Sequence, residues 1–254
     1  MPKSKVNSFT TSHYKKGTSL VPDEVLNMRA PGSMQRQTIE QRRAMKLAAL
    51  RRDMDRLHEK LRVGLLKAPA TATDGQSLYG SAASGISIAF TNSATKVRQE
   101  IQNKILNTIE SALDGLSYTG YTVILERNAW EKLIDSPYIN QTFLSTEKAS
   151  DLRNGLVNEL SLFGGRWIRY RGDSLIDFTA NHGVVVPTGV NNLFVQGFAP
   201  ADTMDQIGVG ALGGPYYVES SLIDEGKRGV KIDIQTNVAM VCTRPGAVID
   251  ITLS

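Results

Sequence analysis

The stretch SMQRQTIEQRRAMKLAALRRDMDRLHEKLRVGLLKAP, residues 33–69, has no proline before its last residue and one glycine near its end. Five apolar residues recur in it at spacings of three and four: Leu47, Leu50, Met54, Leu57 and Leu61. Such spacing places one apolar stripe on an α-helix. We expect a helix over residues 34–66, N-capped by Ser33 and about 50 Å long at 1.5 Å per residue. Because globular helices average about 11–12 residues, this length favours a scaffold role.

Charge is unevenly divided around this helix. Residues 1–67 carry 15 Lys/Arg and 6 Asp/Glu, a net charge of +9, whereas residues 68–254 carry 14 and 19, a net charge of −5. Two explanations stay open: the basic third binds nucleic acid, or basic and acidic parts of neighbouring copies meet. Only Phe9 and Tyr14 are aromatic in the basic part, so a stacking platform for single strands is not supported.

The rest of the chain mixes helices and strands without a repeating βαβ order, which predicts an α+β fold. A buried helical face is expected from Val97, Ile101, Ile105, Ile109 and Leu113. We further expect helices at 21–29, 93–116 (N-capped by Ser93), 128–139 (opened by Asn128) and 147–163. A hairpin-like strand pair is expected at 70–90, and single strands at 120–127, 166–172, 182–189, 191–198, 230–242 and 247–253.

The chemical inventory of the sequence is nearly empty. His13, His58 and His182 lack metal-ligand spacing, and we interpret each as a surface or interface histidine. Cys242 stands alone in an apolar run, which excludes a disulfide framework and a cysteine-based zinc site and indicates a buried, inert thiol. There is no GxSxG or P-loop motif and no apolar run of membrane-spanning length. We expect no catalytic, cofactor-binding or metal residues, and therefore no enzyme.

The segment FAPADTMDQIGVGALGGPYY, residues 198–217, combines two acids with several glycines. Asp202 and Asp205 are three residues apart, which suits a helix cap better than a catalytic or metal site without further ligands. The glycines do not follow a strand and open a helix, so a dinucleotide loop is disfavoured. Glu126, Glu131 and Asp135 are interpreted as ordinary helix-flank charges.

An ordered series of motifs across residues 20–254 resembles the major capsid (head) proteins of tailed bacteriophages, in particular the lambda-type protein E family. The series is VPDEVLNMRAPG before the long helix, TATDGQSLYG after it, NAWEKLIDSPYI, GGRWIRYRGD, VVVPTGVNNLFVQGFAPADTMDQIG, GGPYY and IDIQTNVAMVCTRPGAVIDI. No single motif decides the resemblance, whereas their order and spacing together are specific.

The resemblance implies a Hong Kong 97 type capsid fold, with a long spine helix, a peripheral domain and an axial domain. Residues 1–33 would be an N-terminal arm, the returning strand of an extended loop. Residues 34–92 and 228–254, with the spine helix 34–66, would form the peripheral domain, and residues 93–227 the axial domain. The implied function is self-assembly into hexamers and pentamers of an icosahedral head enclosing double-stranded DNA, in the virion, after assembly in the cytoplasm of a host bacterium.

Scaffold and decoration proteins are further implied partners, and no membrane is. The expected inter-subunit contacts are Arg29, Arg42, Arg43, Arg51, Arg52, Lys15 and Lys16. The expected structural residues of the axial loop are Pro200, Asp202, Asp205, Gly214 and Pro215. Few residues precede the matching region, so we interpret the chain as an N-terminally shortened or prophage copy, whose segment NSFTTSHYKKG would be unpaired.

Overall fold

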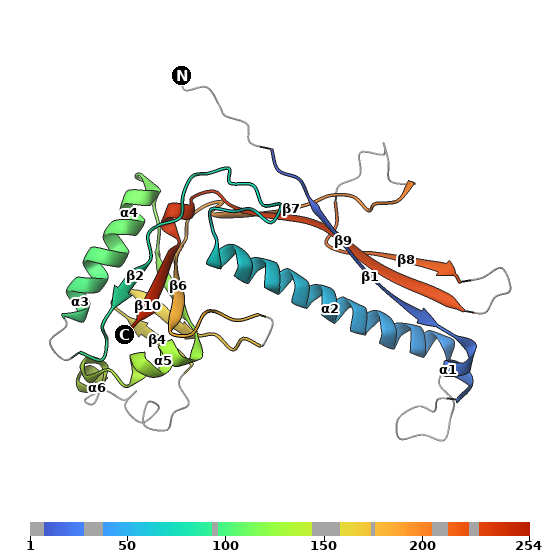
Figure 1. Ribbon diagram of the computed structural model, residues 1–254, viewed down its shortest axis with the longest axis horizontal. Coiled ribbons are helices and arrows are strands. Elements are labelled where there is room, and N and C mark those ends of the chain that lie inside the picture. Colours follow the sequence, from blue (N-terminus) through green and yellow to red (C-terminus); the bar gives the residue numbers. More distant parts are fainter. Residues whose placement is uncertain are drawn as a thin grey trace. The chain divides into compact units, whose positions relative to one another are not determined.

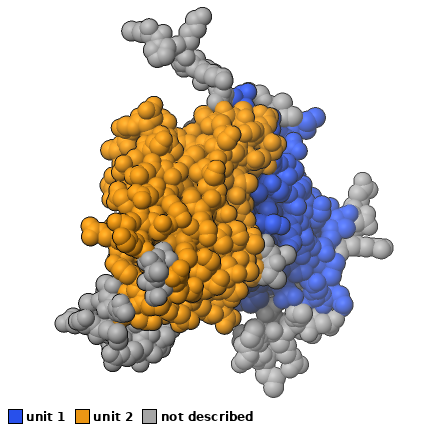
Figure 2. Space-filling model, turned by 60° about the vertical axis from the view of Figure 1, so that its left-hand side comes forward, with its two compact units in different colours: residues 1–61, 196–240 blue, residues 62–195, 241–254 orange. Residues whose placement is uncertain are grey.

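The computed structural model describes residues 8–27, 38–92, 96–143, 158–173, 176–204, 213–223 and 229–254. It is a mixed α+β structure, drawn as a ribbon in Figure 1. The chain divides into two compact units, which Figure 2 colours separately. Unit 1 comprises Met1–Leu61 and Gln196–Met240, and unit 2 comprises Arg62–Val195 and Val241–Ser254.

Unit 1 is organised around one long strand, β9 (Val230–Cys242), whose first eleven residues belong to this unit. β1 (Ser12–Leu20) pairs with it antiparallel over all nine of its residues. β8 (Tyr217–Leu222) pairs antiparallel with the first half of β9 on its other edge, and β7 (Phe194–Phe198) also joins β9. The N-terminal segment that we expected to be unpaired therefore forms a strand from Ser12 onward, and that expectation is wrong.

The long helix is α2 (Ile39–Lys67), with the short α1 (Pro22–Asn27) before it. Its stripe packs on β9, where Leu50 and Met54 are buried with Ile232 and Ile234, as the spacing predicts. The N-cap is Thr38, which exchanges hydrogen bonds with Gln41: each side-chain oxygen accepts from the other residue's backbone N–H. This is a capping box. The predicted cap, Ser33, lies outside the described residues.

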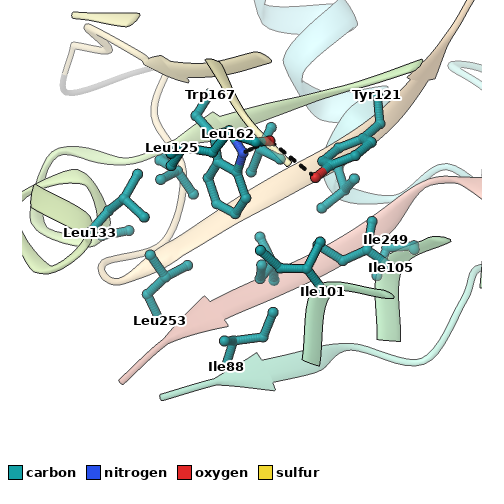
Figure 3. Close-up of a cluster of buried hydrophobic side chains, with 14 of the residues drawn as sticks. Ile88, Ile101, Ile105, Tyr121, Leu125, Leu133, Leu162, Trp167, Ile249 and Leu253 are labelled. Carbon is teal, nitrogen blue, oxygen red and sulfur yellow. Dashed lines mark hydrogen bonds between the residues drawn. The ribbon is translucent and has the colours of Figure 1, made fainter. Parts of the chain in front are cut away.

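Unit 2 is built on a six-stranded sheet of order β2-β10-β6-β3-β5-β4. Its strands are β2 (Ile86–Ile88), β3 (Gly120–Leu125), β4 (Glu159–Leu162), β5 (Gly165–Arg169), β6 (His182–Thr188) and β10 (Ile249–Leu253). The core lies against this sheet and includes Trp167, whose indole N–H donates to the Leu162 carbonyl (Figure 3). Tyr121 is buried beside it, and its hydroxyl donates to the same carbonyl.

One helical segment of unit 2 covers this core and changes type midway. It runs through α3 (Val97–Glu100), a π-helical turn η1 (Ile101–Leu106) and α4 (Asn107–Leu113). All five predicted core residues are at most 1% exposed: Val97, Ile101, Ile105, Ile109 and Leu113. They recur every four residues, so on a pure α-helix each would advance about 40° beyond a full turn. The π turn holds more residues per turn and counters this drift.

Glu126 is the N-cap of α5 (Arg127–Ile134), where the sequence had suggested Asn128. Its carboxylate oxygen Oε2 accepts from the backbone N–H groups of Asn128 at 2.9 Å, Ala129 at 3.4 Å and Asn181 at 2.9 Å. Glu126 is only 7% exposed. The interpretation as an ordinary flank charge is therefore wrong, because this carboxylate joins a helix start to the turn before β6. The next helix is α6 (Pro137–Phe143).

Two further expectations are wrong. Residues 70–90 contain only the short β2, with a turn that the Gly75 N–H closes on the Ala72 carbonyl in place of a hairpin. In the expected helix 147–163, Glu159–Leu162 forms strand β4, because Leu160 and Leu162 alternate inward toward the core. The remainder of that helix, residues 147–157, lies outside the described residues.

The two compact units divide the chain differently from the ranges that the resemblance implied. β9 belongs mainly to unit 1, whereas β10 pairs with β2 and β6 in unit 2, so the closing strands lie in two sheets. Residues 62–92 group with unit 2, and residues 196–227 with unit 1. A 3-10 turn, Pro245–Ala247, separates the two strands. The peripheral and axial roles themselves stay predictions.

Candidate assembly surface

The basic side chains of β1 are paired within the chain. Lys15 Nζ lies 3.2 Å from Asp233 Oδ2 and 3.6 Å from Glu219 Oε2. Lys16 Nζ lies 2.7 Å from Asp53 Oδ2 on α2. Successive residues of a strand point to opposite faces, so Lys15 and Lys16 bind acids on opposite sides of the sheet. Part of the charge asymmetry seen in the sequence is thus neutralised inside one copy.

The electrostatics around Asp233 follow from these pairs. Burial raises the pKa of its carboxyl, but hydrogen bonds from Lys231 and Lys15 outweigh burial and leave the pKa below its ordinary value. The hydrogen bond to Asp233 in turn raises the pKa of Lys15. Both side chains therefore stay charged over a wide range of pH.

The predicted contact residues of α2 differ in their surroundings. Arg43 Nη2 donates to Ser220 Oγ on β8 at 2.7 Å, and the Arg51 guanidinium carbon lies 5.8 Å from the centre of the Tyr216 ring. Arg42 is half-buried and Arg52 is exposed. The seventh predicted contact, Arg29, lies outside the described residues. Arg43, Arg51 and Arg52 are all exposed, and Arg52 takes part in neither of the two contacts described above.

Sequence reasoning missed the exposed apolar side chains of β8. Val218 is 48% exposed, Leu222 63% and Ile223, just beyond the strand, 48%. We call these three residues the β8 patch. A hydrophobic edge strand invites pairing with another chain. The signal in the sequence was weak because YVESSLI alternates only in part and reads as loop beside its glycines.

The loop between β7 and β8 contains the predicted structural residues. The Pro200 carbonyl accepts a hydrogen bond from the Asn237 side-chain amide, and the Gly214 N–H donates to the Tyr217 hydroxyl at 2.6 Å. Asp202 and Pro215 are exposed, and Asp205 lies outside the described residues. The helix cap proposed for this acid pair therefore stays a prediction.

The histidines fall into different environments, and the surface interpretation is wrong for His58. It is 3% exposed, stacks on Tyr216 at 5.2 Å between ring centres, and its Nε2 lies 3.0 Å from Thr236 Oγ1. His13 Nδ1 lies 2.6 Å from Asn237 Oδ1. His182 Nδ1 lies 3.1 Å from Asp250 Oδ2.

Cys242 is buried, as predicted, and burial raises the pKa of its thiol to about 11. Within the described ranges, no three His, Cys, Asp or Glu side chains gather as a group that could hold a metal ion. In the same part of the chain, no helix combines the length and the apolar character needed to cross a membrane.

Comparison with known proteins covers nearly the whole chain. Residues 2–253 match the family described as phage major capsid protein E. No curated protein matches. Among solved structures, the chain is similar to a protein described as a prophage capsid protein from E. coli CFT073, with 13% identity, TM-score 0.56, and 96% of this chain and 77% of that chain covered.

Two phage structures are similar to the same degree. A Mycobacterium phage Che8 chain has 13% identity and TM-score 0.54, with 98% of this chain and 76% of that chain covered. A chain of the mature capsid of bacteriophage PhiM1 has 14% identity and TM-score 0.53, with 100% and 77% covered.

These structures confirm the Hong Kong 97 type capsid fold expected from the motifs, with the long α2 and the sheets in place. The family match extends over both units and includes β1, α2 and the closing strands. The function is therefore structural rather than catalytic, and its place is the capsid of the virion. The chain belongs to the phage major capsid protein E family.

Proposed function

We propose that copies of this chain form hexamers and pentamers of an icosahedral head that encloses double-stranded DNA. Unit 1, with α2, would supply the peripheral contacts, and the part of unit 2 within residues 93–195 would supply the axial ones. Assembly would take place in the cytoplasm of a host bacterium. The prophage origin of one similar structure supports, for this chain, a prophage copy as the source.

The observation that carries this proposal is the β8 patch. Val218 and Leu222 lie exposed on an edge strand and Ile223 just beyond its end, next to the basic start of α2, where Arg43 contacts Ser220. An exposed apolar surface of this kind marks a contact with another protein. In a capsid protein, the natural occupant is a second copy of the same chain. Arg52, exposed on α2, is the charged contact that we expect to join it.

Replacement of the β8 patch tests the proposal. Leu222→Ser with Val218→Ser should stop the formation of capsomers, because the apolar area that a neighbour would cover is removed. Sedimentation velocity and electron microscopy of the purified chain measure the loss. Tyr79→Ser is the matched control, because Tyr79 is 38% exposed and belongs to unit 2 outside the residues 93–195 proposed for the axial contacts. Normal particles from the double variant, or equal loss from the control, would contradict the role of the patch.

Packaged DNA, scaffold proteins and decoration proteins are the further partners that we propose. DNA contact would be non-specific and would use the basic side chains that the chain does not pair itself. Such contact depends steeply on salt, because phosphate binding releases counterions. The intrachain pairing of Lys15 and Lys16 weakens the alternative in which the basic third is a dedicated nucleic-acid-binding module.

A further inference from the structure

β1 is held on unit 1 with little apolar burial. Of its nine residues, Leu20 is the one that is buried, and the others are half-buried or exposed. Backbone pairing with β9 covers the whole strand. A strand with few buried apolar contacts opens locally at low free energy. Its side-chain contacts to β9 must therefore decide how firmly, and in which register, it docks.

Those contacts involve a row of polar side chains on β9. Asp233, Gln235 and Asn237 alternate along the strand on the face opposite to Ile232 and Ile234, which pack against α2. We call them the polar row. Each is at most 7% exposed. Buried polar groups need hydrogen-bond partners, so the strand that pairs with β9 has to place suitable side chains opposite these three residues.

β1 meets each member of the row at a fixed position. His13 is opposite Asn237, Lys15 opposite Gln235, and Gly17 opposite Asp233. His13 bonds to the Asn237 side chain, and Lys15 reaches along the sheet to the Asp233 carboxylate.

Gly17 contributes by lacking a side chain. A Cβ at this position would overlap Asp233 Oδ1, so the carboxylate fills the space that glycine leaves open. The other charged groups facing Asp233 are Lys231 on its own strand and Glu219 on β8, which also approaches Lys15.

Only one register of β1 on β9 makes these contacts with the polar row. A slip of one residue would turn His13 and Lys15 to the α2 side of the sheet. A slip of two residues would place Lys15 or Ser19 opposite Asp233, and either side chain would need the space of the carboxylate. Gly17 is the one glycine in β1. The fit between Gly17 and Asp233 therefore specifies the pairing.

We propose that the polar row is a strand-acceptor site that recognises the pattern His-x-Lys-x-Gly, and that Asp233 admits β1 only with Gly17 opposite it. β1 is then a releasable strand that returns to a single register.

Hydrogen exchange of unassembled full-length chain, read by mass spectrometry, tests the site. In the unmodified chain, amides of residues 12–20 should exchange at least tenfold faster than those of β6 after correction for intrinsic rates. The reason is that β1 separates from β9 while unit 2, which contains β6, stays folded. Equal protection of β1 and β6 would overturn the claim that β1 is releasable. Gly17→Ala should accelerate the exchange of β1 a further tenfold, whereas Gly64→Ala, with no atom within 4 Å of the new Cβ, should not.

A double-mutant cycle separates the fit from a general strand defect. In an Asp233→Ser background the overlapping carboxylate is absent, so Gly17→Ala should no longer accelerate exchange. An equal effect of Gly17→Ala in both backgrounds would overturn the proposal. Should Gly17→Ala alone unfold the chain, the comparison of Asp233→Ser with the double variant still decides. Equal exchange in those two variants supports the fit, and faster exchange in the double variant refutes it.

Discussion

Glu126 offers the sharpest test of how unit 2 is held together. One carboxylate oxygen accepts three backbone N–H groups, two at the start of α5 and one from Asn181. Asn181 has a positive φ of 65°, and its N–H lies in the turn that leads into β6. Glu126→Ala removes all three hydrogen bonds. The Glu126 side chain that accepts them is only 7% exposed.

The expected loss follows from these contacts. Removing an N-cap side chain costs about 1 kcal/mol, within a range of roughly 0.5–2. The half-buried Asn181 N–H loses its partner as well, which adds about 1–3 kcal/mol. We therefore expect Glu126→Ala to lower the free energy of unfolding of unit 2 by about 2–4 kcal/mol. Glu126→Gln keeps an acceptor oxygen and loses only the charge, so about 1 kcal/mol is expected.

Tryptophan fluorescence during urea unfolding is a suitable assay. The chain has two tryptophans, and both Trp130 and Trp167 are buried in unit 2. The unassembled fraction from gel filtration should be used, and the midpoint checked for independence from protein concentration.

Glu131→Ala is the matched control for this measurement. It removes an exposed carboxylate of the same helix that pairs with Arg127, and such surface pairs contribute at most about 1 kcal/mol. The reasoning fails if Glu126→Ala loses no more than Glu131→Ala. It also fails if Glu126→Gln loses as much as Glu126→Ala, because the effect would then come from charge and not from acceptance of the three bonds.

Three further predictions concern the π turn η1, the Cys242 thiol and strand β1. Ile105→Ala should lower the free energy of unfolding by about 2–5 kcal/mol because Ile105 is fully buried. Asn103→Ala, at an exposed position of the same turn, should change it by less than about 0.5 kcal/mol. Urea unfolding measures both, and a small loss at Ile105 would contradict the packing of this turn. Cys242 should resist thiol reagents at pH 8 in the folded chain and react once in urea, since its pKa is about 11; rapid labelling of native protein would refute its burial. The protection of β1 against exchange should persist above pH 3.8, the ordinary pKa of an aspartate such as Asp233. It should be lost as pH falls through the lowered pKa of the folded state, because protonation removes the charge that Lys15 and Lys231 bind. Hydrogen exchange across that range measures it, and protection that is unchanged at the acid end would contradict the expected pH dependence.

Local pattern was sufficient for the elements whose packing follows their own period. The three-and-four spacing of Leu47 to Leu61 predicted α2 and its apolar stripe, which the structure shows packed on β9. The four-residue spacing of Val97 to Leu113 predicted a buried face, although not the π turn that keeps it in line. The motif series predicted the capsid family, because order and spacing along the chain are properties of sequence.

Contacts between residues that are distant in the chain could not be predicted from local sequence pattern. β1 looks like a polar arm in the sequence, and it forms a strand by pairing with β9, more than 200 residues later in the chain. His58 looks like a surface residue of a charged helix until Thr236 and Tyr216 enclose it. Glu126 looks like a flank charge until Asn181 approaches.

The sequence by itself thus determined the family, the long helix, the faces that helices bury and the absence of catalytic motifs. Each of these depends on residues that are neighbours in the chain or that recur at a fixed period. Only the tertiary structure decided the register of β1, the partners of the basic residues, the exposed β8 patch and the division of the closing strands between two sheets. Those features depend on which distant segments meet, and the space that Gly17 leaves for Asp233 exists only once both strands are paired.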